Sequence, residues 1–398
     1  MNMKLNWNFK MWGAIGIVAC LLMASGLYLS TTDRDTESVS VLARVNDEGS
    51  GIFIKESLGI DLDIHDPENW DGLIFMTPGP SSIQHMILSD IVKGLELKFA
   101  QRGTPSGPNT VYWTQVAPGL MVDYMFNSDK DVDGGIAWEP HFSVALDYNK
   151  DGDRCKKVAT TDEYNPDHPC CVIAANNTFL SKNEDATQRF LAGYAKSVQW
   201  INATLDAGSG SDFKELVDMT IDIGTPKIEG KDQMPEFTAK KALYNIKFTY
   251  ELNHGTTTLA DQYVEIMEVY EKLGIIVPEV LTKAGFETPG DFAEHLIQDQ
   301  YLAEVFDGDG NLKSSEELGY TGGITTVKVA YLAADIHQLA LHIGKAKGFF
   351  EEYGIHVDLK GPYGAGGDVM NALLSKHADV GFVGSPPVVS SSFNALRS

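Results

Sequence analysis

Strand and helix patterns alternate regularly over residues 325–387. Apolar side chains occupy every second position of TTVKVAYL, residues 325–332, and of IHVDL, residues 355–359, as in strands that bury one face. A helix pattern over Ile336–Tyr353 separates them and ends at Gly354, and a second helix pattern leads to the apolar strand in ADVGFVGSPP. Strands joined by helices usually pair in parallel. This segment therefore predicts an α/β fold with a mostly parallel sheet.

The same alternation occurs earlier in the chain. The stretches GLIFMTP, VYWTQV and GGIAWEP read as three strands, and helix patterns follow the first two. Two longer helices, around residues 190–205 and 259–273, show apolar stripes at helical spacing, which we expect to pack in the core. The polar stretch 288–323 reads as a connector.

Composition limits the size of the domains and the class of partner. A chain of 398 residues, 43% of them hydrophobic, is long enough for two lobes or domains. The 31 basic and 55 acidic residues give a formal net charge of -24, which disfavours nucleic acid and anionic membrane surfaces as partners. Because the acidic residues are scattered through polar turns, we expect a solvated surface and not a cation site.

An uncharged apolar segment, Met11–Ser30, follows Lys4 and Lys10. About 20 apolar residues span a bilayer, whereas the apolar part of a secretory signal is usually about 7 to 15 residues long. We therefore expect a membrane anchor with the body of the protein outside the cytoplasm. Cleavage as an export signal, or lipidation at Cys20, remains an open alternative.

Three cysteines follow this segment, Cys155, Cys170 and Cys171, which are too few for a disulfide scaffold. One bridge from Cys155 to either neighbour is conceivable. His168 with Cys170 and Cys171 could begin a metal site, but HPCC lacks a second ligand pair at any standard zinc spacing. We expect buried thiols and predict no metal and no cofactor.

Several segments together resemble one protein family. The stretch VKVAYL to GSPP, residues 327–387, resembles the first lobe of the nitrate/sulfonate/taurine (NMT1/THI5-like) periplasmic solute-binding proteins of ABC importers. TPGPSSIQH (77–85), GGIAWEPH (134–141) and HPCCVIAANNTFL (168–180) resemble segments that follow it in that family. In this chain they precede it.

The exchanged order implies a circular permutation of the family's fold. That fold is an α/β, two-lobed periplasmic-binding-protein type II fold, here with an N-terminal transmembrane anchor or signal. Permutation is physically tolerable because the termini of a domain often lie close together at its surface. The alternative is a truncated tandem copy, in which the last quarter of the chain belongs to an incomplete second domain.

This interpretation divides the chain into seven parts. They are the membrane anchor or signal (1–30), a linker (31–40), the first part of lobe one with the hinge (41–72), lobe two (73–165), the continuation of lobe one (166–287), the connector (288–323) and the family's N-terminal part of lobe one (324–398).

Candidate binding residues lie in turns that follow the predicted strands. In open parallel sheets, ligands bind outside the carboxyl ends of the strands, where helix N-termini present unpaired N–H groups. The turns LAADIHQ, GAGGD, GSPP and TPGPSS occupy such positions. Carried over from the resemblance, the candidates in lobe one are Asp335, His337, Gly364, Gly366, Ser385 and Pro386, and those in lobe two are Thr77, Ser81, Ser82, Gln84, Trp138 and Glu139.

The side chains of these turns indicate the kind of ligand. Trp138 could supply a flat apolar wall, and Asp335 and Glu139 could accept hydrogen bonds from a donor group. Packing of Trp138 in the core and capping of a helix by Glu139 are the alternatives. None of the four turns contains Arg or Lys, so an anionic group would depend on helix N-termini, while two carboxylates favour an amine or a ring N–H.

The resemblance implies the extracytoplasmic solute-binding component of an ABC importer. Such a protein captures a small organic sulfonate, taurine-like or nitrate-type solute between its lobes and delivers it to a permease with its ATPase subunit. The alternative is a binding protein for an aminopyrimidine thiamine precursor, or a pyrimidine-forming enzyme of the same fold. The sequence shows no Ser/His/Asp set, phosphate loop or His-Glu-x-x-His motif, so we predict no enzyme.

Overall fold

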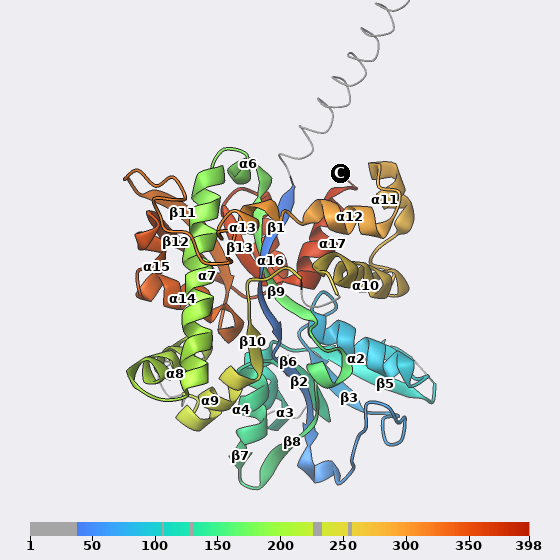
Figure 1. Cartoon of the computed structure of the whole chain (residues 1–398). Helices are drawn as coiled ribbons and strands as arrows, with labels where there is room; N and C mark the ends of the chain where they lie inside the picture. Colours follow the sequence, from blue (N-terminus) through green and yellow to red (C-terminus); the bar gives the residue numbers. More distant parts are fainter. Residues whose placement is uncertain (1–37, 106, 127–130, 226–232, 254–256, 398) are drawn as a thin grey trace, which may run out of the picture.

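Two β-sheets, one above the other in Figure 1, organise the described part of the chain. The computed structural model describes residues 38–105, 107–126, 131–225, 233–253 and 257–397. We call each sheet with its surrounding helices a lobe. Lobe one has the strand order β10-β1-β9-β13-β11-β12, with bounds β1 (Val39–Glu48), β9 (Pro169–Asn176), β10 (Ile246–Phe248), β11 (Thr325–Leu332), β12 (Ile355–Tyr363) and β13 (Val380–Gly384). Lobe two has the order β4-β5-β3-β6-β2-β8-β7, with bounds β2 (Ser50–Lys55), β3 (Ile74–Thr77), β4 (Lys98–Gln101), β5 (Thr110–Gln115), β6 (Gly134–Trp138), β7 (Asn149–Lys150) and β8 (Asp153–Thr160).

Both sheets combine parallel and antiparallel pairs. β11 pairs in parallel with β12 and β13, and β3 pairs in parallel with β5 and β6. By contrast, β1 is antiparallel to β9 and β10, and β2 is antiparallel to β6 and β8. The α/β class is therefore confirmed, but the parallel arrangement holds for only part of each sheet. Each of these antiparallel pairs includes β1 or β2, the two strands that Gly49 joins.

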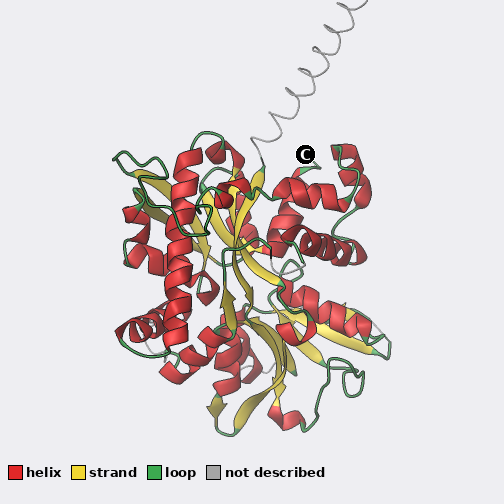
Figure 2. Ribbon diagram, viewed as in Figure 1, coloured by secondary structure: helices red, strands yellow, loops and turns green. Residues whose placement is uncertain are grey.

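Helices pack around both sheets, as Figure 2 shows. The α-helices are α2 (Ile83–Gly94), α3 (Met121–Phe126), α4 (His141–Asp147), α5 (Thr161–Tyr164), α6 (Asn177–Leu180), α7 (Glu184–Ala207), α8 (Ser211–Gly224), α9 (Glu236–Tyr244), α10 (Leu259–Lys272), α11 (Pro278–Ala284), α12 (Pro289–Leu296), α13 (Gln300–Ala303), α14 (Leu339–Ala346), α15 (Phe349–Glu352), α16 (Gly366–Leu374) and α17 (Ser385–Ala395). Short 3₁₀ turns are η1 (Glu56–Leu58), η2 (Pro118–Leu120) and η3 (Ile336–Gln338).

The two predicted apolar stripes lie in the core. On α7, Phe190, Leu191 and Tyr194 are fully buried, and on α10, Leu259 and Tyr263 are fully buried. α7 packs against α14 and α15 along one side of lobe one (Figure 1), while α10 packs against α12 and α17 on the other. Both helices therefore pack on lobe one, and the expected burial of their apolar stripes is confirmed.

Strands from both ends of the chain form the single sheet of lobe one. Val380 of β13 pairs with Val329 of β11 and also with Ala175 of β9. Phe382 of β13 packs against Tyr194 of α7, with ring centroids 5.5 Å apart. Residues 324–397 thus complete the sheet that β1 and β9 begin. Figure 1 shows the start of β1 and the C-terminal end on the same side of the molecule.

The chain passes between the lobes at two places. The first passage is Gly49, between β1 and β2, and the second runs through α5 to β9. Gly49 has φ +82°, and a Cβ added there would lie 2.4 Å from Nε2 of His337. Only glycine combines this backbone conformation with such close approach. The carbonyl of Gly49 accepts a hydrogen bond from the Glu139 N–H at 2.9 Å and contacts His337 Nε2 at 3.0 Å.

Three boundaries differ from those expected from the sequence. The second sheet begins at Ser50, not at residue 73, because β2 pairs with β6 and β8. The stretch 288–323 contains α12 and α13, whose side chains Phe292 and Leu296 are buried, so it packs as more than a linker. The helix expected over Ile336–Tyr353 is divided into η3, α14 and α15, with Gly348 at φ +74° before α15.

The predicted anchor or signal and the linker that follows it lie largely outside the described residues, as does Ser398. Within the described ranges, no helix is both long and apolar enough to cross a membrane. The three described cysteines form no disulfide. Cys155 lies in β8 of lobe two beside Met125, whereas Cys170 and Cys171 lie in β9 of lobe one, so the conceivable bridge is not formed.

Candidate binding site

A cavity of about 170 Å³ lies between the lobes, at the carboxyl ends of strands from both sheets. Its lining includes the turns after β3, β11, β12 and β13. Eight of the twelve predicted residues line it: Ser81, Ser82, Gln84, Trp138, Asp335, His337, Gly364 and Gly366. The remaining lining residues are Pro78, Ile83, Gln115, Ala117, Pro118, Cys170, Cys171, Leu332, Ala365, Gly384 and Pro387. The fold thus brings together segments from both ends of the chain.

Three helix N-termini border this cavity. The N-cap residues are Ser82 for α2, Ala365 for α16 and Gly384 for α17, and all three line the cavity. A helix N-terminus carries partial positive charge and unpaired N–H groups, so it favours an anion. α17 offers fewer donors, because Pro386 and Pro387 in its first turn have no N–H.

Four predicted residues do not line the cavity. Thr77 lies beneath α2, where its Oγ1 is 3.0 Å from Nδ1 of His85. Ser385 and Pro386 are buried in the first turn of α17, and their neighbours Gly384 and Pro387 line the cavity instead. The turn after β13 therefore borders the cavity through Gly384 and Pro387, not through the two residues chosen in it.

Glu139 is the fourth of these residues, and it supports a helix. Its carboxylate accepts hydrogen bonds from the backbone N–H and hydroxyl of Ser143 in α4 and from the side-chain amide of Asn245, the last at 2.6 Å. The side chain is fully buried, and this burial raises the pKa of Glu139. Asp335 is consequently the one carboxylate among the described residues that line the cavity.

Trp138 and its neighbour His141 adjoin the boundary between the lobes. Trp138 lines the cavity, and its ring centroid is 6.2 Å from that of His141. Nε2 of His141, in lobe two, lies 3.0 Å from the carbonyl oxygen of Ala334 in lobe one, so the imidazole donates there. Burial lowers the pKa of His141 to about 4, so this contact is made by a neutral ring.

Cys170, Cys171 and His337 form a cluster that the sequence analysis did not recognise. Cys170 Sγ lies 3.6 Å from His337 Nδ1, and Asp335 Oδ1 lies 3.2 Å from the same nitrogen. All four side chains are buried. HPCC was noted as a motif, but its partner is His337, 167 residues further along the chain from Cys170. His168, the nearer histidine, is not part of the cluster.

The pKa values of these groups move in opposite directions. A hydrogen bond from the Cys171 thiol lowers the pKa of Cys170 to about 6, and the same interaction raises the pKa of Cys171 well above its usual value. Burial alone would lower the pKa of His337, but the charges of Cys170 and Asp335 outweigh burial and raise it. Both shifts favour the charged forms, a thiolate at Cys170 and an imidazolium at His337.

A second cavity, of about 200 Å³, lies between α2 and α10. Most of its lining comes from α2 and α10, including Asp90, Glu265 and Lys272. The turns after β11, β12 and β13 do not line it, so we place the candidate site in the cavity of about 170 Å³ at the carboxyl ends of the strands.

Comparisons with known proteins found similarities to one family, one curated protein and one solved structure. The sequence profile of the NMT1-like family matches residues 14–210. A segment of 62 residues is 40% identical to "Putative binding protein YtlA" of Bacillus subtilis (strain 168), and it spans 16% of this chain but only 18% of that protein's length. The structure is also similar to the ligand-binding component of an ABC-type import system from Staphylococcus aureus, solved with zinc bound. That similarity has a TM-score of 0.46 and 16% sequence identity, over 69% of this chain and 76% of the other.

Proposed function

Because the chain belongs to the NMT1-like family, whose members are solute-binding proteins and not enzymes, we propose that it is the extracytoplasmic solute-binding component of an ABC importer. It captures a small organic sulfonate or taurine-like solute, or a nitrate-type anion, in the cavity between its lobes. It then delivers this solute to a membrane permease with its ATPase subunit. The N-terminal apolar segment, Met11–Ser30, tethers the protein to the membrane.

The convergence of three helix N-termini on one cavity carries the proposal. N–H groups at the starts of α2 and α16 can surround an anionic head group, and no Lys or Arg is among the described lining residues. A sulfonate or nitrate disperses its charge over three oxygens, so several weak donors suit it. At 170 Å³ the cavity is smaller than typical drug-sized sites of roughly 300–1,000 Å³, which favours a small solute.

A taurine-like zwitterion also fits the opposite wall. Its ammonium group can donate to Asp335, the lining carboxylate, and its short carbon chain can lie against Trp138. The indole N–H of Trp138 has no hydrogen-bond partner in the structure. A solute oxygen that reached it would satisfy this donor.

An aminopyrimidine is the second candidate solute. Asp335 can accept from an exocyclic amine, and Trp138 offers an aromatic face against which a ring can stack. Burial of Glu139 outside the cavity removes one of the two carboxylates that favoured a solute with an amine or a ring N–H, so Asp335 alone is left to accept from either candidate.

Solute binding would favour closure of the two lobes. They are joined by two short connections, and a ligand held by residues of both lobes stabilises the closed arrangement over an open one. The contact between His141 and the Ala334 carbonyl is one of those that couple the lobes.

Circular permutation is part of the same proposal. Support comes from β13, which lies between β9 and β11, so that the C-terminal strands fill the interior of the sheet begun by β1 and β9. An incomplete second domain would bury its strands against each other and not in the first domain's sheet.

Thermal unfolding of the full chain with a panel of taurine, alkanesulfonates, nitrate, bicarbonate and aminopyrimidines tests the function. A solute at 100 times its dissociation constant stabilises the folded state by about 2.7 kcal/mol, which raises the midpoint by several degrees. We expect the sulfonates and taurine to do so. A cooperative transition that no solute shifts would contradict this proposal.

A matched pair of glycines makes the test specific to the cavity. Gly364 lines the cavity and a Cβ there meets no atom within 4 Å, so Gly364→Leu fills space without a backbone clash. Gly367 is equally open but does not line the cavity. We expect Gly364→Leu to abolish the shift and Gly367→Leu to retain it. Equal shifts in both variants would place the solute elsewhere.

A further inference from the structure

Cys170, Cys171 and His337 have the composition of a metal site. Their donor atoms, two sulfurs and one imidazole nitrogen, all lie within 4.8 Å of one another, and all three side chains are buried. The same three residues line the cavity between the lobes. Thiolate and imidazole together select soft or borderline cations over Mg²⁺ and Ca²⁺, which prefer oxygen.

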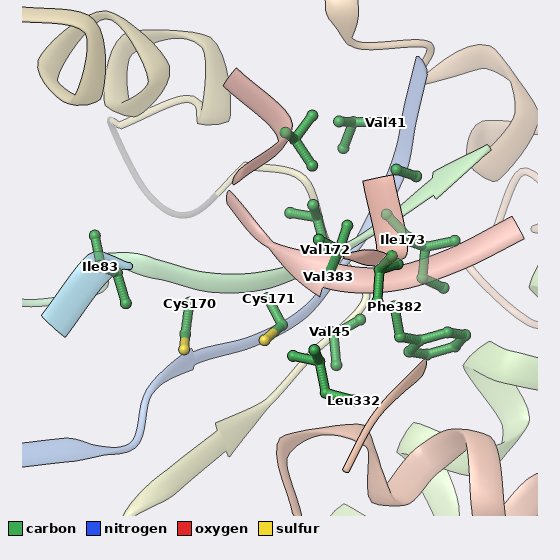
Figure 3. Close-up of a cluster of buried hydrophobic side chains, with 14 of the residues drawn as sticks. Val41, Val45, Ile83, Cys170, Cys171, Val172, Ile173, Leu332, Phe382 and Val383 are labelled. Atoms are coloured by element: carbon green, nitrogen blue, oxygen red, sulfur yellow. The ribbon is translucent and has the colours of Figure 1, made fainter. Parts of the chain in front are cut away.

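A β-bulge makes the two adjacent cysteines available to one ligand. Successive side chains of a strand normally point to opposite faces. In the ladder between β1 and β9, Asn46 pairs with Cys171 and Asp47 pairs with Pro169, which leaves Cys170 without a partner on β1. Such an extra residue redirects its side chain. Figure 3 shows both sulfur atoms on the same side of β9.

The backbone around Gly49 orients the imidazole for coordination. Nε2 of His337 lies 3.0 Å from the Gly49 carbonyl oxygen, which can only accept, so Nε2 carries a proton and donates. Nδ1 is then the nitrogen that faces Cys170. Metal-bound histidines usually donate their second ring N–H to a carbonyl or carboxylate in this way, which fixes the ring.

The spacing of the donors also fits a tetrahedral ion. Zn–S bonds of about 2.3 Å and Zn–N bonds of about 2.05 Å at a tetrahedral angle separate sulfur and nitrogen by about 3.6 Å. Cys170 Sγ and His337 Nδ1 are 3.6 Å apart. This pair therefore already has the separation of two ligands of one ion, and the Cys171 sulfur lies within 4.8 Å of both.

We propose that Cys170, Cys171 and His337 bind a thiophilic divalent cation of the Zn²⁺ class at the wall of the cavity. Binding displaces the Nδ1 proton of His337 and the remaining thiol proton, so protons are released. Three protein donors leave one position of a tetrahedral ion for an exchangeable ligand, unlike a closed four-ligand structural site. A donor group of the solute can occupy that position.

The positions of these three ligands in the chain explain why the residues around HPCC did not predict a metal site. A local search requires a second ligand pair near HPCC, but the third ligand comes from η3, at the other end of the chain. The proposal does not depend on which organic solute the cavity holds.

Titration of the full-length chain with Zn²⁺ tests the proposal. The protein is kept reduced, freed of metal with a chelator that is then removed, and titrated in competition with a colorimetric zinc indicator. We expect one high-affinity ion per chain. Co²⁺ in place of Zn²⁺ should give the strong visible bands and the near-ultraviolet thiolate charge-transfer band of a tetrahedral site.

Variants identify the ligands. Cys170→Ser, Cys171→Ser and His337→Gln should each weaken binding by at least about 100-fold, since changes outside the ligand set alone often cost 10–100-fold. Cys155→Ser removes a buried thiol of lobe two and should bind as the unaltered chain does. His337→Gln retains a donor for the Gly49 carbonyl, and comparable thermal midpoints without metal verify that each variant is folded.

Four results would overturn the proposal: no ion bound to the unaltered chain, unchanged binding by the Cys170→Ser/Cys171→Ser double variant, equal loss in Cys155→Ser, or a Co²⁺ complex without the thiolate band. Failure of the solute proposal gives a different pattern, in which Zn²⁺ binds but no member of the solute panel shifts the midpoint. Solute binding by the metal-free chain with no Zn²⁺ binding would remove the metal site alone.

Discussion

Cys170 is a residue whose ionisation can be measured directly. In the metal-free protein we expect iodoacetamide labelling of Cys170 to rise with pH around a midpoint of about 6, because the hydrogen bond from Cys171 and the charge of His337 stabilise the thiolate. Cys155 should remain unlabelled up to alkaline pH, since burial raises its pKa to about 12. Mass spectrometry of the labelled peptides measures both rates.

One variant separates the effect of the His337 charge on the pKa of Cys170 from the effect of the Cys171 hydrogen bond. His337→Gln removes the imidazolium but leaves Cys171 in place, so the midpoint for Cys170 should move upward. A midpoint near the ordinary thiol value of about 8.5 in the unaltered chain would contradict the arrangement of the cluster.

The turns that border the cavity could be predicted from the sequence, because they follow strands. The contact between Cys170 and His337 could not, because it depends on a β-bulge. Asp335 and Gly364 were candidates because of the family resemblance and because turns at the carboxyl ends of strands in an α/β fold are recognisable, and both line the cavity. Glu139 follows a strand too, but its side chain turns toward Ser143 of α4 and away from the cavity. The association of Cys170 with His337 depends on a bulge that no sequence pattern reveals.

Among the elements, the packing of α15 on α7 holds the C-terminal segment of the chain against the rest of lobe one. Phe350 is fully buried and stacks on Phe190, with ring centroids 5.1 Å apart. Phe350→Ala should lower the free energy of unfolding by about 3–5 kcal/mol, because it removes buried surface and leaves a cavity. Urea unfolding followed by circular dichroism measures the loss.

Phe237 provides the control for this substitution. Its side chain is 55% exposed, so Phe237→Ala should change stability by no more than about 0.5 kcal/mol. Equal losses in the two variants would show that the contact between α7 and α15 is not a source of stability.

The proposed permutation predicts that the order of two segments, residues 38–323 and residues 324–398, can be exchanged without loss of the fold. A chain in which residues 324–398 precede residues 38–323, joined by a flexible Gly/Ser linker, should unfold cooperatively within a few degrees of the original. The start of β1 and the C-terminal end lie on the same side of the molecule (Figure 1), so the linker need not cross the protein. Differential scanning calorimetry compares the two chains.

The tandem-copy alternative makes the opposite prediction for a shortened chain. If the last quarter belonged to another domain, residues 38–323 alone would retain the original transition. We expect them to lose it, because β9 would lack its partner β13 in the interior of the sheet. Cooperative unfolding of the shortened chain at the original midpoint would support the alternative.

The overall architecture was accessible from the sequence because strands and helices alternate with clear periodicity. The boundary between the lobes was not, since only Gly49 separates β1 from β2. The polar stretch NDEGSG around it reads as an ordinary turn, which carries no signal that the chain leaves one sheet for another.

The carbonyl oxygen of Gly49 accepts two hydrogen bonds. It accepts from the Glu139 N–H in lobe two and from the His337 ring in the wall of the cavity, and it belongs to the residue that links the two sheets. A ligand that turns this ring must therefore also alter the bonding of the joint. In the proposed importer, a solute contact at the His337 ring would reach the connection between the lobes through this one oxygen atom, without any relay of intervening side chains.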